Sequence, residues 1–409
     1  MNGSLLTMET EARLSDGEVC VGQDGRITYA GARRADAEAP QDLPVVDARG
    51  GTILPGLIDA HVHFQLAPEG NPFVTGIMRP YSYLMLRVAQ AMRDTLHAGV
   101  TTARDLGGVD RGPALAVNDG LVEGPRTKQS IAILSPTGGP GDLTLPNGFS
   151  ADQLTHVIQP VASAVDTDDE ARLAVRKLVR AGADVIMVCT SGRFGHPMES
   201  PDDIGFSEEQ VRVIVEELSS RGKLPVAANA MRPAGVLAAV RGGASSIEHG
   251  YHLDKECVDA MLESGTWLVP ALGRLHVPDP PGGPALPPQM KKAWAEGAKA
   301  SISLALASGV PVAMGSMAGV TPHGRNLSEL SHLQELGMSP VDALKAATVN
   351  AARLLRMESE VGTLAEGKLG DVVVVAGDPL QDAGVLADPS NVRFVAKEGT
   401  IVKHTLEHS

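Results

Sequence analysis

Short apolar segments alternate with longer segments of helical periodicity between about residue 56 and residue 360. Several short segments, such as VIMVC and LPVAANA, are apolar on both faces, which is typical of strands buried in a parallel sheet. Eight segments fit this description: Leu57–His63, Val100–Asp105, Ser130–Leu134, Val185–Cys189, Val226–Ala230, Ser246–His249, Trp267–Ala271 and Val312–Gly315. Eight strands alternating with helices favour an α/β fold, a (β/α)8 TIM barrel, over a doubly wound open sheet.

Clear start signals mark several of the helices between these strands. Thr167 and Ser207 each stand three residues before a Glu or Gln, the spacing of a capping box. Ser339 is followed by Pro340, which fits the first position of a helix. These signals support the alternation of strand and helix that a barrel requires.

The two ends of the chain have a different pattern. Residues 1–55 contain short β-like runs, such as VCVGQDGRITYAG, which DG and RGG turns separate. Strand character returns over residues 361–409, in DVVVVAGDPL and NVRFVAKEGTIVK. We therefore predict that both ends together form a small composite β-sandwich domain beside a barrel of residues 56–360.

The composition is that of an ordinary globular protein, with 409 residues, 43% hydrophobic and 21% charged. A net charge of −14 argues against nucleic acid or an anionic membrane as a partner, because both need a basic face. The three cysteines are far apart and odd in number, which is typical of a reducing compartment. No signal peptide is evident, and no apolar run approaches the ~20 residues of a membrane span. We expect a cytoplasmic homo-oligomer that acts on a small molecule.

Two histidines end the first predicted strand. His61 and His63 point the same way because side chains alternate along a strand. In a barrel, the carboxyl ends of the strands carry the active site. The pair is either a set of metal ligands or two hydrogen-bonded histidines in a polar barrel mouth.

Longer motifs make the chain resemble the amidohydrolase superfamily, and its prolidase-like and imidazolonepropionase-like branch in particular. The motifs are TILPGLIDAHVHF, GVTTARDLGG, SIEHGYHLD, MGSMAGVTPHGRN and GTLAEGKLGDVVVVAGDPL. The resemblance implies hydrolysis of amide or cyclic-amide C–N bonds. It also implies one or two metal ions held by the HxH pair, a carboxylated Lys on strand four, His on strands five and six, and Asp on strand eight. That Asp also serves as the base for the attacking water.

This sequence departs from the family pattern at three of these six positions. His61, His63 and His249 are present, but Met187, Asn229 and Met317 stand where the pattern has Lys, His and Asp. A methionine can be neither carboxylated nor used as a proton acceptor. Hydrolysis by metal-activated hydroxide needs both a Lewis acid and a base. We therefore expect no ordinary dinuclear mechanism and no resident cofactor.

Three interpretations remain open. In the first, the chain is a metal-independent enzyme that catalyses either hydrolysis or a non-hydrolytic reaction such as cyclisation, elimination or isomerisation. It is an inactive binding relative or a disabled variant of a C–N hydrolase. Or a single transition metal sits on His61, His63 and His249, with the thioethers of Met187 and Met317 favouring a copper-like soft ion. The first interpretation is the one that we adopt, and metal analysis separates it from the third.

Further residues at the predicted strand ends complete the candidate site. As catalytic groups we predict His61, His63, His249, Asn229 and His323. As substrate-binding groups we predict Asp105, Met187, Thr190, Arg193, Arg232, Tyr251, His252 and Met317. Asp105 either orients a histidine or accepts backbone N–H groups in the following Gly107–Gly108 turn. The arginines either bind a substrate carboxylate or are solvated at the surface.

Overall fold

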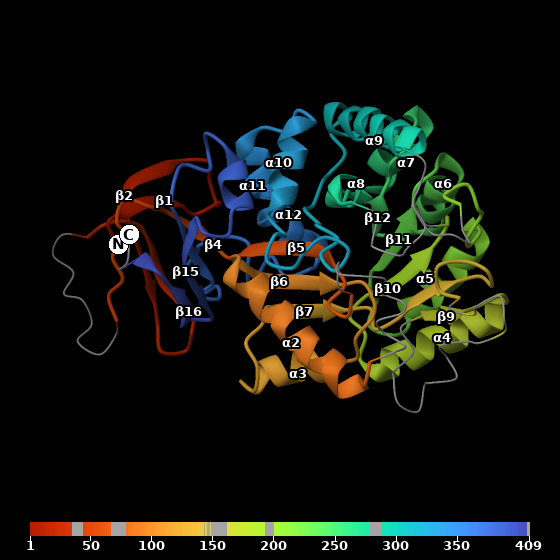
Figure 1. Cartoon of the computed structure of the whole chain (residues 1–409), viewed down its shortest axis with the longest axis horizontal. Helices are drawn as coiled ribbons and strands as arrows, with labels where there is room; N and C mark the ends of the chain where they lie inside the picture. The colour runs from red at the N-terminus through yellow and green to blue at the C-terminus, as the bar shows by residue number, and fades with distance from the viewer. Residues whose placement is uncertain are drawn as a thin grey trace.

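A β-domain and a barrel lie side by side along the long axis of the computed structural model (Figure 1). The structure describes residues 1–34, 44–66, 79–142, 144, 148, 162–192, 200–278 and 288–406. None of the helices in these ranges combines the length and apolarity that crossing a membrane requires.

The barrel is built from parallel strands, as the sequence predicts. They are β5 (Leu57–Val62), β6 (Val100–Asp105), β7 (Arg126–Gln129), β8 (Ile133–Ser135), β10 (Ile186–Cys189), β11 (Val226–Ala230), β12 (Ser246–His249) and β13 (Trp267–Val269). Hydrogen bonds join β5, β6 and β7 in one sheet, and β8, β10, β11, β12 and β13 in another, with β9 (Ala162–Ala164) beyond β8. The fold is a (β/α)8 barrel with a β-sandwich domain, and this prediction is confirmed.

The third strand position differs from the prediction. It consists of two short strands, β7 pairing with β6 and β8 pairing with β10, rather than one strand over Ser130–Leu134. Ile131 separates them with a φ of 67°, a left-handed conformation that interrupts a ladder. The chain thus changes partner sheets in the middle of this strand position.

The eighth strand position is also less regular than the alternation predicts. Val312–Gly315 forms a single parallel bridge, between Val312 and Leu268, instead of a ladder. Ala313 N donates to Leu268 O, and Ala60 N donates to Met314 O at 2.8 Å. Met314 N turns away to Ala346 O, so the segment closes the barrel without qualifying as a strand.

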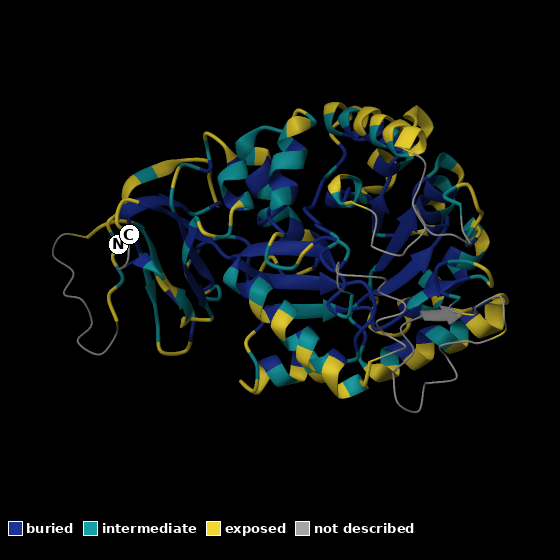
Figure 2. Cartoon of the chain, in the orientation of Figure 1, coloured by how far each residue is buried: buried dark blue, intermediate teal, exposed yellow. Residues whose placement is uncertain are grey.

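Helices cover the outside of the barrel, with their inner faces buried and their outer faces exposed (Figure 2). They are α2 (Tyr81–His97), α3 (Gly112–Asn118), α4 (Asp168–Ala181), α5 (Glu208–Ser219), α6 (Pro233–Gly242), α7 (Lys255–Ser264), α8 (Gly273–His276), α9 (Pro288–Ser308), α10 (Ser328–Glu335), α11 (Pro340–Ala346) and α12 (Val349–Leu354). Both predicted capping boxes are confirmed, at Thr167 and at Ser207. Pro340 opens α11 behind the N-cap Ser339, as predicted.

The β-domain takes strands from both ends of the chain. Its N-terminal strands are β1 (Gly3–Leu6), β2 (Arg13–Val21), β3 (Ile27–Ala32) and β4 (Thr52–Pro55), and its C-terminal strands are β14 (Val372–Val375), β15 (Val392–Lys397) and β16 (Thr400–His404). The order is β16-β15-β14-β4-β1-β2-β3, so β4 and β14 join the two halves. A short 3-10 helix, Ala383–Ala387, lies between β14 and β15. A core of its own, including Leu5, Ile53, Val374 and Phe394, fills this domain.

Candidate active site

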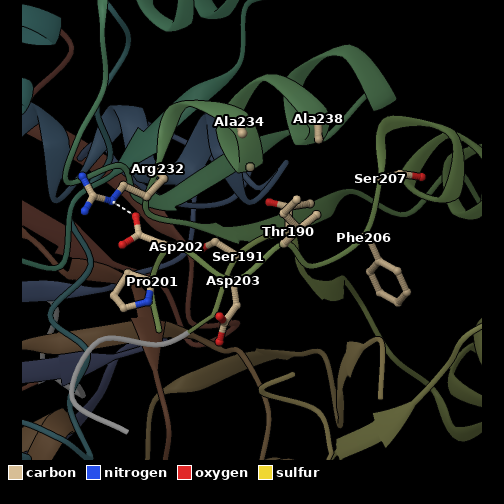
Figure 3. A pocket seen from close by; sticks show the side chains of 12 residues that line it. Thr190, Ser191, Pro201, Asp202, Asp203, Phe206, Ser207, Arg232, Ala234 and Ala238 are labelled. Carbon is tan, nitrogen blue, oxygen red and sulfur yellow. Dashed lines mark ion pairs between the residues drawn. The ribbon is translucent and has the colours of Figure 1, made fainter. Parts of the chain in front are cut away.

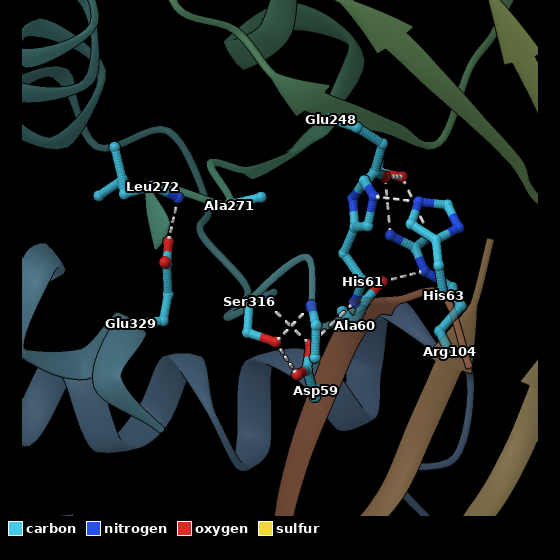
Figure 4. Close-up of polar contacts among 12 residues, drawn as sticks. Asp59, Ala60, His61, His63, Arg104, Glu248, Ala271, Leu272, Ser316 and Glu329 are labelled. Atoms are coloured by element: carbon cyan, nitrogen blue, oxygen red, sulfur yellow. Dashed lines mark hydrogen bonds and ion pairs between the residues drawn. The ribbon is translucent and has the colours of Figure 1, made fainter. Parts of the chain in front are cut away.

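Two histidines face each other at the carboxyl end of β5 (Figure 4). The Nε2 atoms of His61 and His63 are 3.3 Å apart, and both side chains are buried. His63 Nδ1 lies 3.0 Å from Gly107 O. Because a carbonyl only accepts, His63 Nδ1 carries the hydrogen, and the Nε2 of a neutral His63 presents a lone pair. Burial and the neighbouring His61 lower the pKa of His63 to about 3, which favours this neutral form.

A buried carboxylate orients the other histidine of the pair. His61 Nδ1 lies 2.8 Å from Glu248 Oε2, at the end of β12. Burial raises the pKa of Glu248, but the Arg104 guanidinium and the His61 hydrogen bond outweigh that effect and hold the pKa at about 2. Glu248 is therefore ionised and accepts the Nδ1 hydrogen of His61. The Nε2 atom of His61 is left pointing at His63.

Arg104 and Ser246 complete the partners of this carboxylate. Arg104 Nη2 donates to Glu248 Oε1 at 2.7 Å, and Ser246 Oγ donates to the same oxygen at 2.6 Å. The guanidinium also donates to Ala60 O and to Ser246 Oγ, at 2.6 and 3.1 Å. The sequence interpretation missed both Arg104 and Glu248. The available signal was a charged residue inside an otherwise buried strand, in TTARD and SIEH.

A second buried carboxylate ties the first strand to the eighth strand position. Asp59 Oδ1 accepts from the backbone N–H groups of His61 and Ser316, both at 3.0 Å. Asp59 Oδ2 accepts from Ser316 Oγ and from Asn326 Nδ2, the latter at 2.8 Å. These bonds fix the backbone on which His61 stands, and the sequence interpretation did not identify Asp59.

His249 stands beside the pair on an unusual backbone. Its φ is 76°, and its ring centroid lies 5.3 Å from that of His61 and 5.2 Å from that of Tyr251. Its Nδ1 atom is buried without a hydrogen-bond partner among the described residues. Burial and the neighbouring His61 lower the pKa of His249 to about 3. The Tyr251 side chain is fixed in place, because its hydroxyl donates to Ala271 O at 2.7 Å.

At the three positions that depart from the family pattern, each residue makes contacts within the protein. Met187 is 3% exposed and packs in an apolar cluster that includes Leu106 and Ala227. The Asn229 amide donates to Ser191 O at 3.1 Å. Met317 is half-buried, and its backbone N–H donates to His61 O at 2.8 Å.

Of two further candidates, Asp105 binds backbone N–H groups and His323 packs against an aromatic ring. Asp105 accepts from the N–H groups of Phe64 and Gly107, both at 2.9 Å, which is the second of its two predicted roles. Burial raises the pKa of Asp105 to about 7. His323 stacks on Phe64 and has its Nδ1 3.2 Å from Thr95 Oγ1.

The remaining candidates lie near α6 rather than around His61. Arg232 pairs with Asp202 at 2.7 Å and stacks over Trp294, which also contacts the His252 ring. Thr190 and Arg232 line a cavity of about 80 Å³. Figure 3 shows the side chains that line it. Arg193 lies outside the described residues.

Comparison with known proteins gives matches along nearly the whole chain. The model of the amidohydrolase family matches residues 52–402. Ochratoxinase of Aspergillus niger is 33% identical over 86% of this chain and 75% of its own length. Imidazolonepropionase of Symbiobacterium thermophilum is 28% identical over 90% of this chain and 85% of its own. A prolidase complexed with N-methylphosphonate-L-proline superimposes with a TM-score of 0.88 at 30% identity, covering 98% of both chains.

Proposed function

Since the chain belongs to the amidohydrolase family, we propose that it is an enzyme acting on a small molecule with an amide-like or cyclic C–N group. We further propose that its altered site works without a metal. The observation that carries the proposal is the hydrogen-bonded line from Arg104 through Glu248 to His61, which leaves the Nε2 lone pairs of His61 and His63 facing each other at 3.3 Å. Such a line places a proton acceptor at the carboxyl ends of the strands, where a barrel carries its active site. The relatives named ochratoxinase, imidazolonepropionase and prolidase support the substrate class.

The donor set does not fit a dinuclear metal centre. Met187 and Met317 offer thioethers at positions where hard oxygen ligands would be needed. The amide hydrogens of Asn229 are directed to a backbone carbonyl. Among the described residues, His61, His63 and His249 do not bring their ring nitrogens within 4.8 Å of one another as a group. The chemistry we propose therefore uses the side chains alone.

In this proposal each histidine has a separate task. His61 Nε2 accepts a proton from the substrate, because Glu248 fixes the His61 hydrogen on Nδ1 and balances the charge that the ring takes up. His63 Nε2, 3.3 Å away, presents a second lone pair, because Gly107 O fixes the His63 hydrogen on Nδ1. His249 Nδ1 is buried without a hydrogen-bond partner among the described residues, and we assign it to bind the polar atom of the scissile or rearranging group.

Turnover measurements test the proposal. A panel of N-acyl amino acids, lactams and imidazolone-type cyclic amides would be incubated with the protein and followed by mass spectrometry. We expect a turned-over member whose conversion falls at least about 100-fold in His61→Ala and His249→Ala, as the loss of acid–base groups predicts. His97→Ala is the matched control, because His97 is a half-exposed histidine on α2 that pairs with Glu123.

Chelation separates the alternatives. We expect the rate of substrate turnover at the barrel site to stay unchanged when a chelator is added. Loss of turnover on chelation, with recovery on adding a metal that binds to the barrel histidines, would overturn the metal-independent mechanism. Binding of panel members without any turnover would favour the inactive binding relative instead.

A further inference from the structure

We propose that His276, His332 and Glu335 form a binding site for one divalent transition-metal ion of the Zn²⁺ type, on the outside of the barrel. Two imidazoles and one carboxylate are ligands that such ions accept, with water filling the remaining positions. Within the described part of the chain, these residues are the one group of three His, Cys, Asp or Glu side chains whose ligand atoms all lie within 4.8 Å of one another.

The site joins two helices. His276 is the last residue of the single-turn helix α8, and His332 and Glu335 stand three residues apart on α10. Residues at this spacing share one helix face. The rings of His276 and His332 are stacked, with centroids 3.8 Å apart and planes 7° from parallel. Glu335 Oε2 lies 3.9 Å from His332 Nδ1.

A buried ring nitrogen in this group lacks a hydrogen bond. His332 Nδ1 is shielded from solvent and has no hydrogen-bond partner among the described residues, and a metal ion would provide one. Burial lowers the pKa of His332, and His276 lowers it further. Only the neutral form of an imidazole coordinates a metal ion.

Binding requires a local adjustment that the exposure of His276 permits. One ion cannot lie in the planes of two parallel rings, and Zn²⁺ needs its nitrogens at about 2.0–2.1 Å. His276 is exposed at the end of its helix, so its ring can turn out of the stack without disturbing the core. His332 is held in place by the body of α10, and Glu335 is exposed and free to rotate towards the ion.

A metal ion here would fix the C-terminal end of α8. The N-terminal end is already tied to α10, because Glu329 accepts from the N–H groups of Leu272 and Gly273, at 2.7 and 2.9 Å. The segment between β13 and α8 includes Ala271, whose carbonyl holds Tyr251. The metal would thus stiffen the loop that supports the tyrosine beside His249.

Calorimetric titration with Zn²⁺ tests this site apart from the barrel histidines. In the His61→Ala/His63→Ala background we expect one bound equivalent. Adding His276→Ala or His332→Ala should raise the Kd by at least about tenfold. Even the mutation of a residue that only hydrogen-bonds a metal ligand lowers metal affinity about 10–100-fold. Glu335→Gln should weaken binding as well. His97→Ala is the control, because its His–Glu pair has a single imidazole and should leave the Kd unchanged.

No binding in that background, or an unchanged Kd in both histidine variants, would overturn the site. Hydrogen exchange gives an independent readout. We expect added Zn²⁺ to slow exchange of the backbone amides of residues 272–277, and to have no effect in His276→Ala. The outcome is separable from the proposed function, because any chelator effect on turnover that disappears in His276→Ala belongs to the α8–α10 site and not to the barrel.

Discussion

Arg104→Met tests whether the buried charges under the histidines hold the site together. Arg104 is 2% exposed, and its guanidinium donates to Glu248, Ser246 and Ala60 O. The substitution keeps much of the side-chain volume and removes all three hydrogen bonds. It also leaves the Glu248 carboxylate buried beside His61 without its cation. Removing one partner of a buried ion pair costs about 3–5 kcal/mol, so we expect the free energy of unfolding to fall by that amount.

A double-mutant cycle gives the sharper result. Glu248→Gln alone leaves Arg104 as the unpaired charge, so it should also destabilise the protein. The double variant carries neither charge, and we expect it to be less destabilised than the sum of the single variants by about 1–3 kcal/mol. Urea denaturation at pH 7 measures all four proteins. The exposed pair of Arg241 and Glu256, at 2.6 Å, provides the control, and Arg241→Met should cost less than about 1 kcal/mol.

Two outcomes would refute this reasoning. One is a loss below about 1 kcal/mol for Arg104→Met, which would mean that water or a local rearrangement satisfies Glu248. The other is additivity of the two single substitutions within about 0.5 kcal/mol, which would mean that the charges do not interact.

The other predictions are tests of individual contacts. Gly315→Ala should abolish turnover, because a Cβ there would lie 2.6 Å from His61 Cβ and 2.5 Å from Val269 Cγ1; a variant with normal turnover contradicts this. Thr167→Ala removes the α4 capping box and should lower the free energy of unfolding by about 1 kcal/mol, measured in urea. Glu217, whose pKa two arginine hydrogen bonds lower to about 2, should stabilise the protein above pH 4.5 and lose that effect as the pH falls towards 2. Glu217→Gln should therefore flatten the pH profile of stability there. One combined variant refills the replaced ligand positions: Met187→Lys, Asn229→His and Met317→Asp. In a His276→Ala background this variant should bind more metal than its parent, measured by elemental analysis, and should hydrolyse dipeptides. If it gains neither metal nor activity, residues other than these three also keep the barrel from acting as a metallohydrolase.

Much of the barrel could be predicted from the sequence because its elements are specified locally. Apolar runs set the strands, and the capping residues at Thr167 and Ser207 set the helix starts. The failures came where tertiary contacts override the local pattern. Ile131 turns left-handed between two sheets, and Met314 N bonds to a helix instead of a strand. Neither feature can be recognised from the pattern of hydrophobic residues in the sequence.

The site was predictable in part for the same reason. His61, His63 and His249 lie together, as the strand ends require. The partners Arg104 and Glu248 are 144 residues apart, and no spacing rule connects them. The surface group around His332 depends on how α8 packs against α10, which the sequence does not encode as a motif.

The pairing of β4 with β14 has a consequence for synthesis of the chain. Thr52 pairs with Val375, about 320 residues later, and Figure 1 shows strands from both ends of the chain in one domain. At ~5–20 residues per second, a ribosome takes roughly 15–65 s to deliver the second strand. During that interval the free edge of β4 is open to pairing with another chain. A stop codon before β14 would leave that edge open permanently, so we expect shortened products to aggregate even when their barrel residues are complete.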